Sequence, residues 1–129
     1  MTDMIFLIGR VLFGGYFLYN AWNHLAHSGA LAGYAKFKGV PMPRVAVIGS
    51  GLLLLIGGYS MLTGMHTVLG AWALVLFLVP VTLQMHTFWK ETPENKQTQQ
   101  IMFGKNVALI GAALMMLAIS TPWVDTFGI

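Results

Sequence analysis

The chain consists of four long apolar runs that are separated by shorter polar segments. The runs cover about residues 4–26, 45–63, 68–88 and 104–120. As a helix, each is long enough to cross the hydrocarbon core of a bilayer, which is ~30 Å thick. No segment shows the alternation over about ten residues that marks the strands of a membrane β-barrel. The pattern predicts an all-α, integral membrane four-helix bundle, formed by residues 1–129 as a single domain.

The two longer connections differ in character. In residues 27–44, apolar residues recur at helical spacing around Tyr34 and up to Lys38, and Gly39 and two prolines follow. This pattern predicts a short interfacial helix between the first and second spans. Residues 90–100 are hydrophilic throughout and are expected to form a water-exposed loop.

Composition supports a membrane location. Of the 129 residues, 57% are hydrophobic and only 9% are charged, whereas about a quarter of a soluble domain is charged. Soluble enzymes, nucleic-acid-binding modules and disulfide scaffolds are therefore excluded. The absence of cysteine excludes thiolate metal sites and dithiol chemistry. The start of the chain has an acid, Asp3, where a signal peptide would have basic residues, so the first run is expected to remain as a span.

The basic residues indicate an orientation. Six of the seven lysines and arginines, all but Arg10, lie in or beside two connections, residues 27–44 and 89–103. The excess of positive charge on cytoplasmic loops predicts that both connections are cytoplasmic and that both termini lie outside a bacterial-type inner membrane. The net charge of +3 is thus a topology signal, and no nucleic-acid partner is expected.

Polar side chains inside apolar runs are costly and are the strongest functional signal in this chain. Three groups of them fall at the ends of runs that meet on one membrane face, so we expect them to converge at one level. On the first run, the offsets 0, 3, 4 and 7 place four of them on one helical face. The set comprises Asn20, Trp22, Asn23, His24 and His27 on the first run, Gln84, His86 and Trp89 on the third, and Lys105 and Asn106 on the fourth.

Three interpretations of this polar set remain open. Histidine, asparagine and tryptophan are common at membrane interfaces, where they bond water and lipid. The set also suits a pocket for a small amphipathic ligand such as a quinone. Two histidines at similar depth, His24 and His86, could ligate haem iron or another metal. Only Glu91 and Glu94 are acids near them, so the carboxylate that often orients a ligating histidine is missing from the membrane, and no metal site is predicted.

Two further features concern packing. Gly104, Ala108 and Ala112 form a small-residue stripe that predicts tight packing within the bundle, with a homodimer seam as the alternative. Arg10 lies two turns inside the first run and no acid lies within any run. We expect it to snorkel or to bond backbone carbonyls and the C-terminal carboxylate, with a headgroup contact as the alternative. Close helix contacts are also expected at Gly14, Gly15, Gly57, Gly58 and Gly70.

Four short motifs resemble the DoxX family of small membrane proteins. They are Gly9-Arg10, Tyr34 through Gly39-Val40-Pro41-Met42-Pro43, His86-Thr87-Phe88-Trp89, and Gly104-Lys105-Asn106-Val107-Ala108. The resemblance implies a four-helix inner-membrane protein, and it marks Arg10, His86, Trp89, Lys105 and Asn106 as family-like positions. The family takes its name from a membrane subunit of a thiosulfate:quinone oxidoreductase. Many members have a lysine where this chain has His24 and an acid where it has Leu54, which argues against an intramembrane proton relay.

Together these observations predict a membrane component of a quinone-linked oxidoreductase system. The expected partners are membrane lipids and either a quinone or a redox protein, with quinone favoured over haem as the cofactor. The expected roles are His24 and His86 as proton or hydrogen-bond partners, Trp22 and Trp89 as stacking walls, Asn20, Asn23, Gln84 and Asn106 as orienting groups, and Lys105 as a positive charge. One alternative is a non-catalytic subunit or chaperone that binds another membrane protein, and a lipophile carrier ranks third.

Overall fold

A computed structural model describes residues 2–123 of the chain as a set of helices. Their bounds are α1 (Thr2–Ala26), α2 (Ser28–Phe37), α3 (Pro43–Thr63), α4 (Thr67–Met85), the 3₁₀ helix η1 (Phe88–Lys90) and α5 (Pro93–Leu117). Within the described part of the chain, α1, α3, α4 and α5 are long and apolar enough to cross a membrane. The prediction of an all-α, four-helix membrane bundle with a short helix between the first two spans is confirmed.

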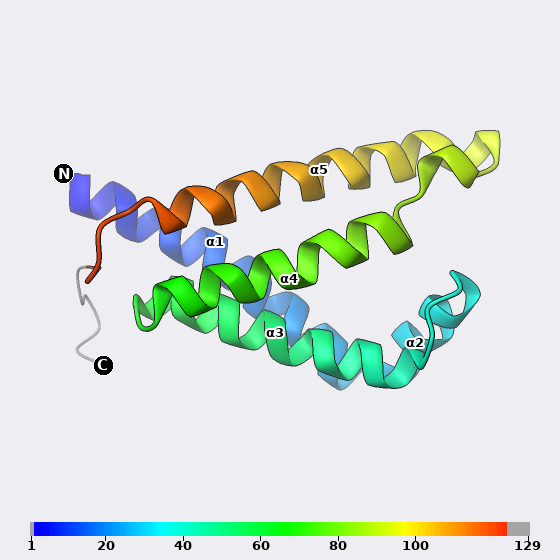
Figure 1. The fold of residues 1–129 in the computed structure, drawn as a ribbon, viewed down its shortest axis with the longest axis horizontal. Helices are drawn as coiled ribbons and strands as arrows, with labels where there is room; N and C mark the ends of the chain where they lie inside the picture. The colour runs from blue at the N-terminus through cyan, green and yellow to red at the C-terminus, as the bar shows by residue number, and fades with distance from the viewer. Residues whose placement is uncertain (1, 124–129) are drawn as a thin grey trace.

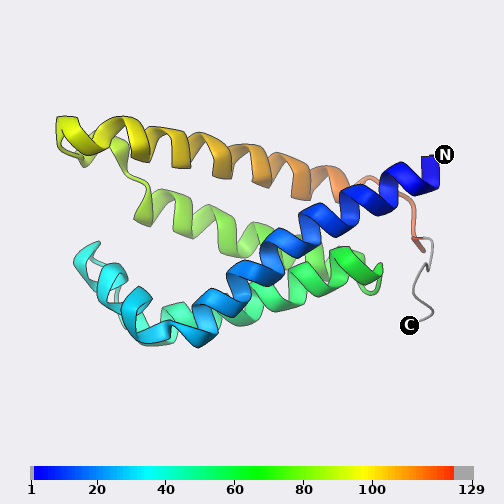
Figure 2. The same cartoon turned by 180° about the vertical axis from the view of Figure 1, so that it is seen from behind.

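The long helices pack in chain order, with α3 in contact with both α1 and α4. Helix α1 crosses the back of the bundle. Figure 1 shows α4 lying between α3 and α5, and Figure 2 shows α1 running diagonally across α3. The short α2 and η1 lie at one end of the bundle, which we call the loop end (Figures 1 and 2). The α3–α4 turn and the start of α1 lie at the opposite end. Both lysine-rich connections therefore belong to the loop end.

Local sequence explains where α3 ends and where α5 begins, and the start of α5 corrects one prediction. Gly64 closes α3 in the left-handed conformation, with φ of 81°, a backbone region that only glycine adopts without strain. The prediction that residues 90–100 form a loop is wrong, because α5 already begins at Pro93. Thr92 at the N-cap, Pro93 at the first helical position and Glu94 in the first turn are a helix-start pattern, and α5 extends beyond its apolar part.

The buried core is narrow, and large apolar side chains cover the outside. Leu54 has no exposed surface and lies in the core cluster. By contrast, Leu12 is 70% exposed and Met115 is 68% exposed. Such a surface is stable only where lipid replaces water. The fully buried large side chains are Phe17, Leu54, Met61, Leu74 and Leu78.

Glycines bring α1 and α3 into backbone contact. A Cβ atom at Gly14 would lie 2.8 Å from the carbonyl oxygen of Gly58 and 2.9 Å from the backbone nitrogen of Leu62. A Cβ atom at Gly58 would in turn lie 2.9 Å from the backbone nitrogen of Leu18. These distances are too short for any side chain, so the two helices approach as closely as they do only because both positions are glycine.

The contact between α3 and α4 follows the same rule. A Cβ atom at Gly57 would overlap the side chain of Leu74, and one at Gly70 would overlap the side chain of Ser60. The close contacts predicted for Gly14, Gly57, Gly58 and Gly70 are therefore present. Gly15 has no atom within 4 Å of its Cβ position, so the prediction of a contact at that residue is wrong within the described chain.

The small-residue stripe of α5 does not pack inside the bundle. Gly104 has open space at its Cβ position, and Ala108 is exposed while Ala112 is half-buried. Bundle packing is therefore the wrong interpretation for Gly104 and Ala108. Of the four long helices in the described chain, α5 has the smallest buried share in its apolar window, 11%.

Replacement of Gly14 by alanine tests the α1–α3 contact. The added methyl group would meet backbone atoms that cannot move aside, so Gly14→Ala should lower the free energy of unfolding by about 1–3 kcal/mol, the usual cost of overpacking. The measurement is unfolding of the purified protein in mixed micelles. Gly15→Ala is the matched control and should cause no loss, because its Cβ position is open. Equal loss in both variants would contradict the proposed contact.

Candidate functional site: a cavity at the loop end

A cavity of about 740 Å³ lies at the loop end between α2, α3 and α4. Most of its wall is aliphatic, with Leu31, Val45, Leu53, Leu76 and Val81 among the lining side chains. Five side chains with polar atoms also line it, namely His24, Tyr34, Ser50, Gln84 and His86. The size and the few polar groups on an apolar wall are typical of small-molecule sites.

His24 is the one residue of α1 on the cavity wall, and α3 holds its ring. Its Nδ1 lies 2.9 Å from the hydroxyl of Ser50 and 3.3 Å from the carbonyl of Val47. The Ser50 hydroxyl itself donates to the Val47 carbonyl at 2.8 Å. The ring also meets Phe77 of α4 edge-on, with centroids 5.6 Å apart. The imidazole is thus fixed between two helices.

His86 and Gln84 reach the cavity from the end of α4. His86 is the C-cap of α4, and its Nδ1 lies 2.8 Å from Oε1 of Gln99 on α5. Gln84 donates from Nε2 to the backbone carbonyl of Lys38 at 3.1 Å. These contacts join the end of α4 to the first turns of α5 and to the segment after α2.

An ion pair between Lys38 and Glu91 connects the two loop-end segments. The two side chains are hydrogen-bonded and are only 9% and 17% exposed. The ammonium group also lies 5.8 Å from the ring centroid of Tyr34. The hydrogen bond to Glu91 raises the pKa of Lys38, while partial burial acts in the opposite direction. The pair ties the segment after α2 to the α4–α5 connection beside the cavity.

The other predicted site residues lie away from this cavity in the described structure. Trp22 and Trp89 are 65% and 52% exposed and do not line it. The amide of Asn20 donates to the carbonyl of Tyr16 on its own helix, and Lys105 donates to the Tyr16 hydroxyl at 2.9 Å. Asn23 is half-buried and His27 exposed on α1, and Asn106 is 5% exposed on α5.

Several lining residues were not singled out from the sequence. Ser50 is the one hydroxyl inside the first half of the second apolar run, and Pro80 interrupts the third run. Both were visible signals, because polar groups and prolines inside spans are exceptional. Phe77 gave no such signal, since aromatic residues in apolar runs usually serve packing. Tyr34 lies in the connection 27–44, where its spacing predicted only the interfacial helix.

Arg10 lies near the opposite end of α1, where it joins α1 to the end of α3. It is 3% exposed, and it donates from Nε to the carbonyl of Met61 at 3.3 Å and from Nη2 to that of Leu62 at 3.0 Å. Its guanidinium carbon lies 5.5 Å and 5.7 Å from the ring centroids of Phe6 and Trp123. The C-terminal carboxylate, its other expected partner, lies outside the described residues.

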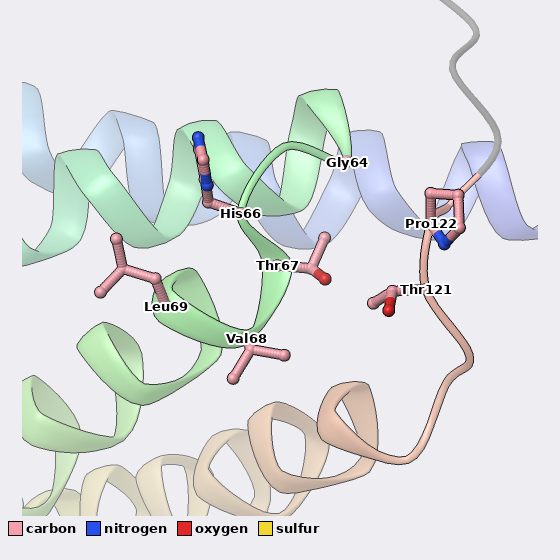
Figure 3. A pocket seen from close by; sticks show the side chains of 7 residues that line it. All are labelled: Gly64, His66, Thr67, Val68, Leu69, Thr121 and Pro122. Atoms are coloured by element: carbon pink, nitrogen blue, oxygen red, sulfur yellow. The ribbon is translucent and has the colours of Figure 1, made fainter.

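A second, smaller cavity of about 340 Å³ lies at this opposite end. Figure 3 shows Thr67 at the start of α4 and Thr121 after α5 on its two sides, while the ring of His66 points away from them. Among the described residues, no group of three or more histidines and acids could hold a metal ion.

The fold and its exposed apolar faces define a multi-pass α-helical membrane protein. A family model described as DoxX matches residues 5–87, which is more than half of the chain. The protein therefore belongs to the DoxX family. The match covers His24, Gln84 and His86, whereas the motif at Gly104–Ala108 lies beyond it. Comparisons with curated proteins and with solved structures found no significant match.

Removal of the Glu91 carboxylate tests the loop-end ion pair. A raised lysine pKa stabilises the fold at pH values below the ordinary lysine pKa, and this contribution is lost as the pH rises through the raised value. Glu91→Gln should therefore lower the unfolding free energy at pH 8 by about 1.5 kcal/mol, the lower range for hydrogen bonds to charged groups. The difference from the wild type should shrink at pH values above the pKa of Lys38.

The matched control is Glu94→Gln, which removes an exposed acid from the first turn of α5. Its effect should be limited to a helix-dipole contribution of about 0.5 kcal/mol that added salt screens. Unfolding in mixed micelles at pH 8 and at high pH measures both variants. A pH-independent loss in Glu91→Gln would contradict the role of the ion pair.

Proposed function

We propose that the protein is a membrane component of an oxidoreductase system and that it binds a quinone-class lipid in the loop-end cavity. The observation that carries the proposal is the cavity itself, which combines an aliphatic wall with His24, Gln84 and His86 at one level. A quinone has the same division, with a polar ring and an isoprenoid tail. Membership of the DoxX family supports the redox context.

The residues on the wall fit such a ligand. The aliphatic side chains of α3 and α4 would hold the tail, and the two imidazoles with Gln84 would hydrogen-bond the oxygens of the ring. Tyr34 and Phe77 supply aromatic surfaces on the same wall. In this proposal they take the stacking role that sequence analysis gave to Trp22 and Trp89.

The positive charge that sequence analysis gave to Lys105 needs a different assignment. Lys105 is exposed on α5 and its ammonium lies 5.5 Å from the ring centroid of Tyr16. Lys38 is in contact with two residues of the wall, because its carbonyl accepts from Gln84 and its ammonium lies 5.8 Å from the ring centroid of Tyr34. We therefore assign the electropositive rim to Lys38, and we assign Lys105 to the interface between α1 and α5. The cytoplasmic orientation of the loop end stays part of the proposal, on the basis of its lysines and arginines.

Binding of a short-tailed ubiquinone analogue tests the proposal. Calorimetric titration of decylubiquinone into the purified protein in nanodiscs should show saturable binding. His24→Ala should weaken it by about tenfold or more, because it removes a polar contact and the edge of the wall. His27→Ala is the matched control, since His27 lies on the same helix end but is exposed. Absence of binding, or equal loss in both variants, would contradict the proposal.

A second candidate function is that of a non-catalytic subunit that binds another membrane protein. It is favoured by α5, whose residues Gly104 and Gly111 have open space at their Cβ positions and whose Ala108 is exposed. Small residues on an outward face let a partner helix approach closely in lipid. This candidate does not require a ligand in the cavity.

A bulky side chain on α5 distinguishes the two functions. Under the second function, a stoichiometric membrane partner should co-purify with the wild type and be lost in Ala108→Trp, because the indole ring would hold the partner helix away. Val107→Trp is the control, as Val107 is 49% exposed on a neighbouring face. Quantitative mass spectrometry of the purified complexes measures the ratio. Equal retention in both variants would argue against the α5 surface.

A further inference from the structure

We infer that the loop-end cavity selects ligands that donate hydrogen bonds, so that it binds the hydroxyl-bearing reduced form of a quinone more tightly than the carbonyl form. This inference rests on the proposed function, because it concerns the same cavity and ligand class. It follows from the donor and acceptor roles of the side chains on the wall. Each role is fixed by a contact on the side away from the ligand.

The tautomer of His24 follows from its contacts with α3. A backbone carbonyl can only accept, and the hydroxyl hydrogen of Ser50 already points to the carbonyl of Val47 at 2.8 Å. Both groups next to Nδ1, the Ser50 oxygen and the Val47 carbonyl, therefore accept. The arrangement in which all three of these contacts are hydrogen bonds has the hydrogen of the neutral ring on Nδ1, and Nε2 is then left with a lone pair.

His86 and Gln84 follow the same reasoning. The partner of His86 is the side-chain oxygen Oε1 of Gln99, which lies 2.8 Å from Nδ1. This oxygen can only accept. His86 therefore also carries its hydrogen on Nδ1 and has an acceptor at Nε2. Gln84 donates one of the two hydrogens of its amide nitrogen to the carbonyl of Lys38, which leaves Oε1 as an acceptor and one N–H as a donor.

The free acceptors belong to residues of the cavity wall. His24 and His86 line it, and their Nε2 atoms bond to no residue in the described part of the chain. Within residues 2–123, the indole nitrogen of Trp123 is the only buried side-chain polar atom without a partner. Both Nε2 atoms therefore keep accessible surface, and in this inference that surface meets the ligand. Pro80, also on the wall, has no N–H to give to the carbonyl of Leu76 four residues before it.

The cavity wall thus offers more hydrogen-bond acceptors than donors. Tyr34 carries a hydroxyl that can act in either role, and the hydroxyl hydrogen of Ser50 is already used. A quinol presents two hydroxyl groups that match the lone pairs of the imidazoles. A quinone presents two carbonyl oxygens, and an acceptor that faces another acceptor remains unpaired, which weakens binding.

A matched pair of ligands tests the inference. Decylubiquinol and decylubiquinone have the same tail and ring and differ in the two hydroxyl groups. Calorimetric titrations of both into the protein in nanodiscs, without oxygen and at pH 8, should show binding of the quinol at least about tenfold tighter. Equal affinity, or tighter binding of the quinone, would overturn the inference and leave the proposed function standing.

A charge at residue 99 should reverse the role of His86. In Gln99→Lys the ammonium group can only donate, so Nδ1 must accept and the ring hydrogen must move to Nε2. The preference for the quinol should fall by about threefold or more while the quinone still binds. Gln100→Lys is the matched control, because Gln100 is exposed on the same helix and carries the same change of charge.

Nitrogen NMR of histidine-labelled protein gives a readout that is independent of ligands. In the wild type, the signals of His24 and His86, assigned through His→Gln variants, should show a hydrogen on Nδ1. The signal of His86 should change to the other tautomer in Gln99→Lys and should not change in Gln100→Lys. A hydrogen on Nε2 of both wild-type rings would overturn the inference. If neither ligand binds, the proposed function fails and the inference fails with it.

Discussion

The position of His24, the one residue of α1 on the cavity wall, depends on the backbone contact between α1 and α3. Lipid provides no hydrophobic force between helices, so close packing must hold them together. Gly14 and Gly58 allow that packing in the middle of the pair. On one side of it Arg10 bonds the last carbonyls of α3, and on the other side His24 bonds Ser50. The glycine contact therefore fixes the register in which His24 reaches the cavity.

The cavity depends equally on polar contacts made outside the apolar core. The ion pair of Lys38 with Glu91 and the bond from Gln84 to the Lys38 carbonyl hold the segment after α2 against the end of α4. On the other side, Gln99 orients His86. Gln99 can do so because the hydrophilic segment before the fourth span is helical and brings its side chain alongside α4. A hydrophilic chain segment thus contacts a histidine of the cavity wall.

Only part of the candidate site could be predicted from the sequence. Helical spacing and shared membrane depth pointed to His24, Gln84 and His86, and these three line one cavity. The same reasoning included Trp22 and Lys105, which face away from it. The depth of a residue along a span can be counted from the sequence. Whether its side chain points into the cavity depends on where the neighbouring helix lies, which the sequence does not show. In an all-apolar helix the hydrophobic pattern does not show which face meets that neighbour.

The number of spans, the all-α class, the short helix after the first span and the grouping of basic residues at one end follow from the amino-acid sequence alone. These follow from the cost of unpaired backbone groups and charges in lipid, which acts on each segment separately. The packing of the helices is needed to show which glycines form contacts, that the stripe around Ala108 faces outward, and that Ser50 and Gln99 contact the two histidines. These features depend on how helices pair, and a pairing depends on the shapes of two surfaces together.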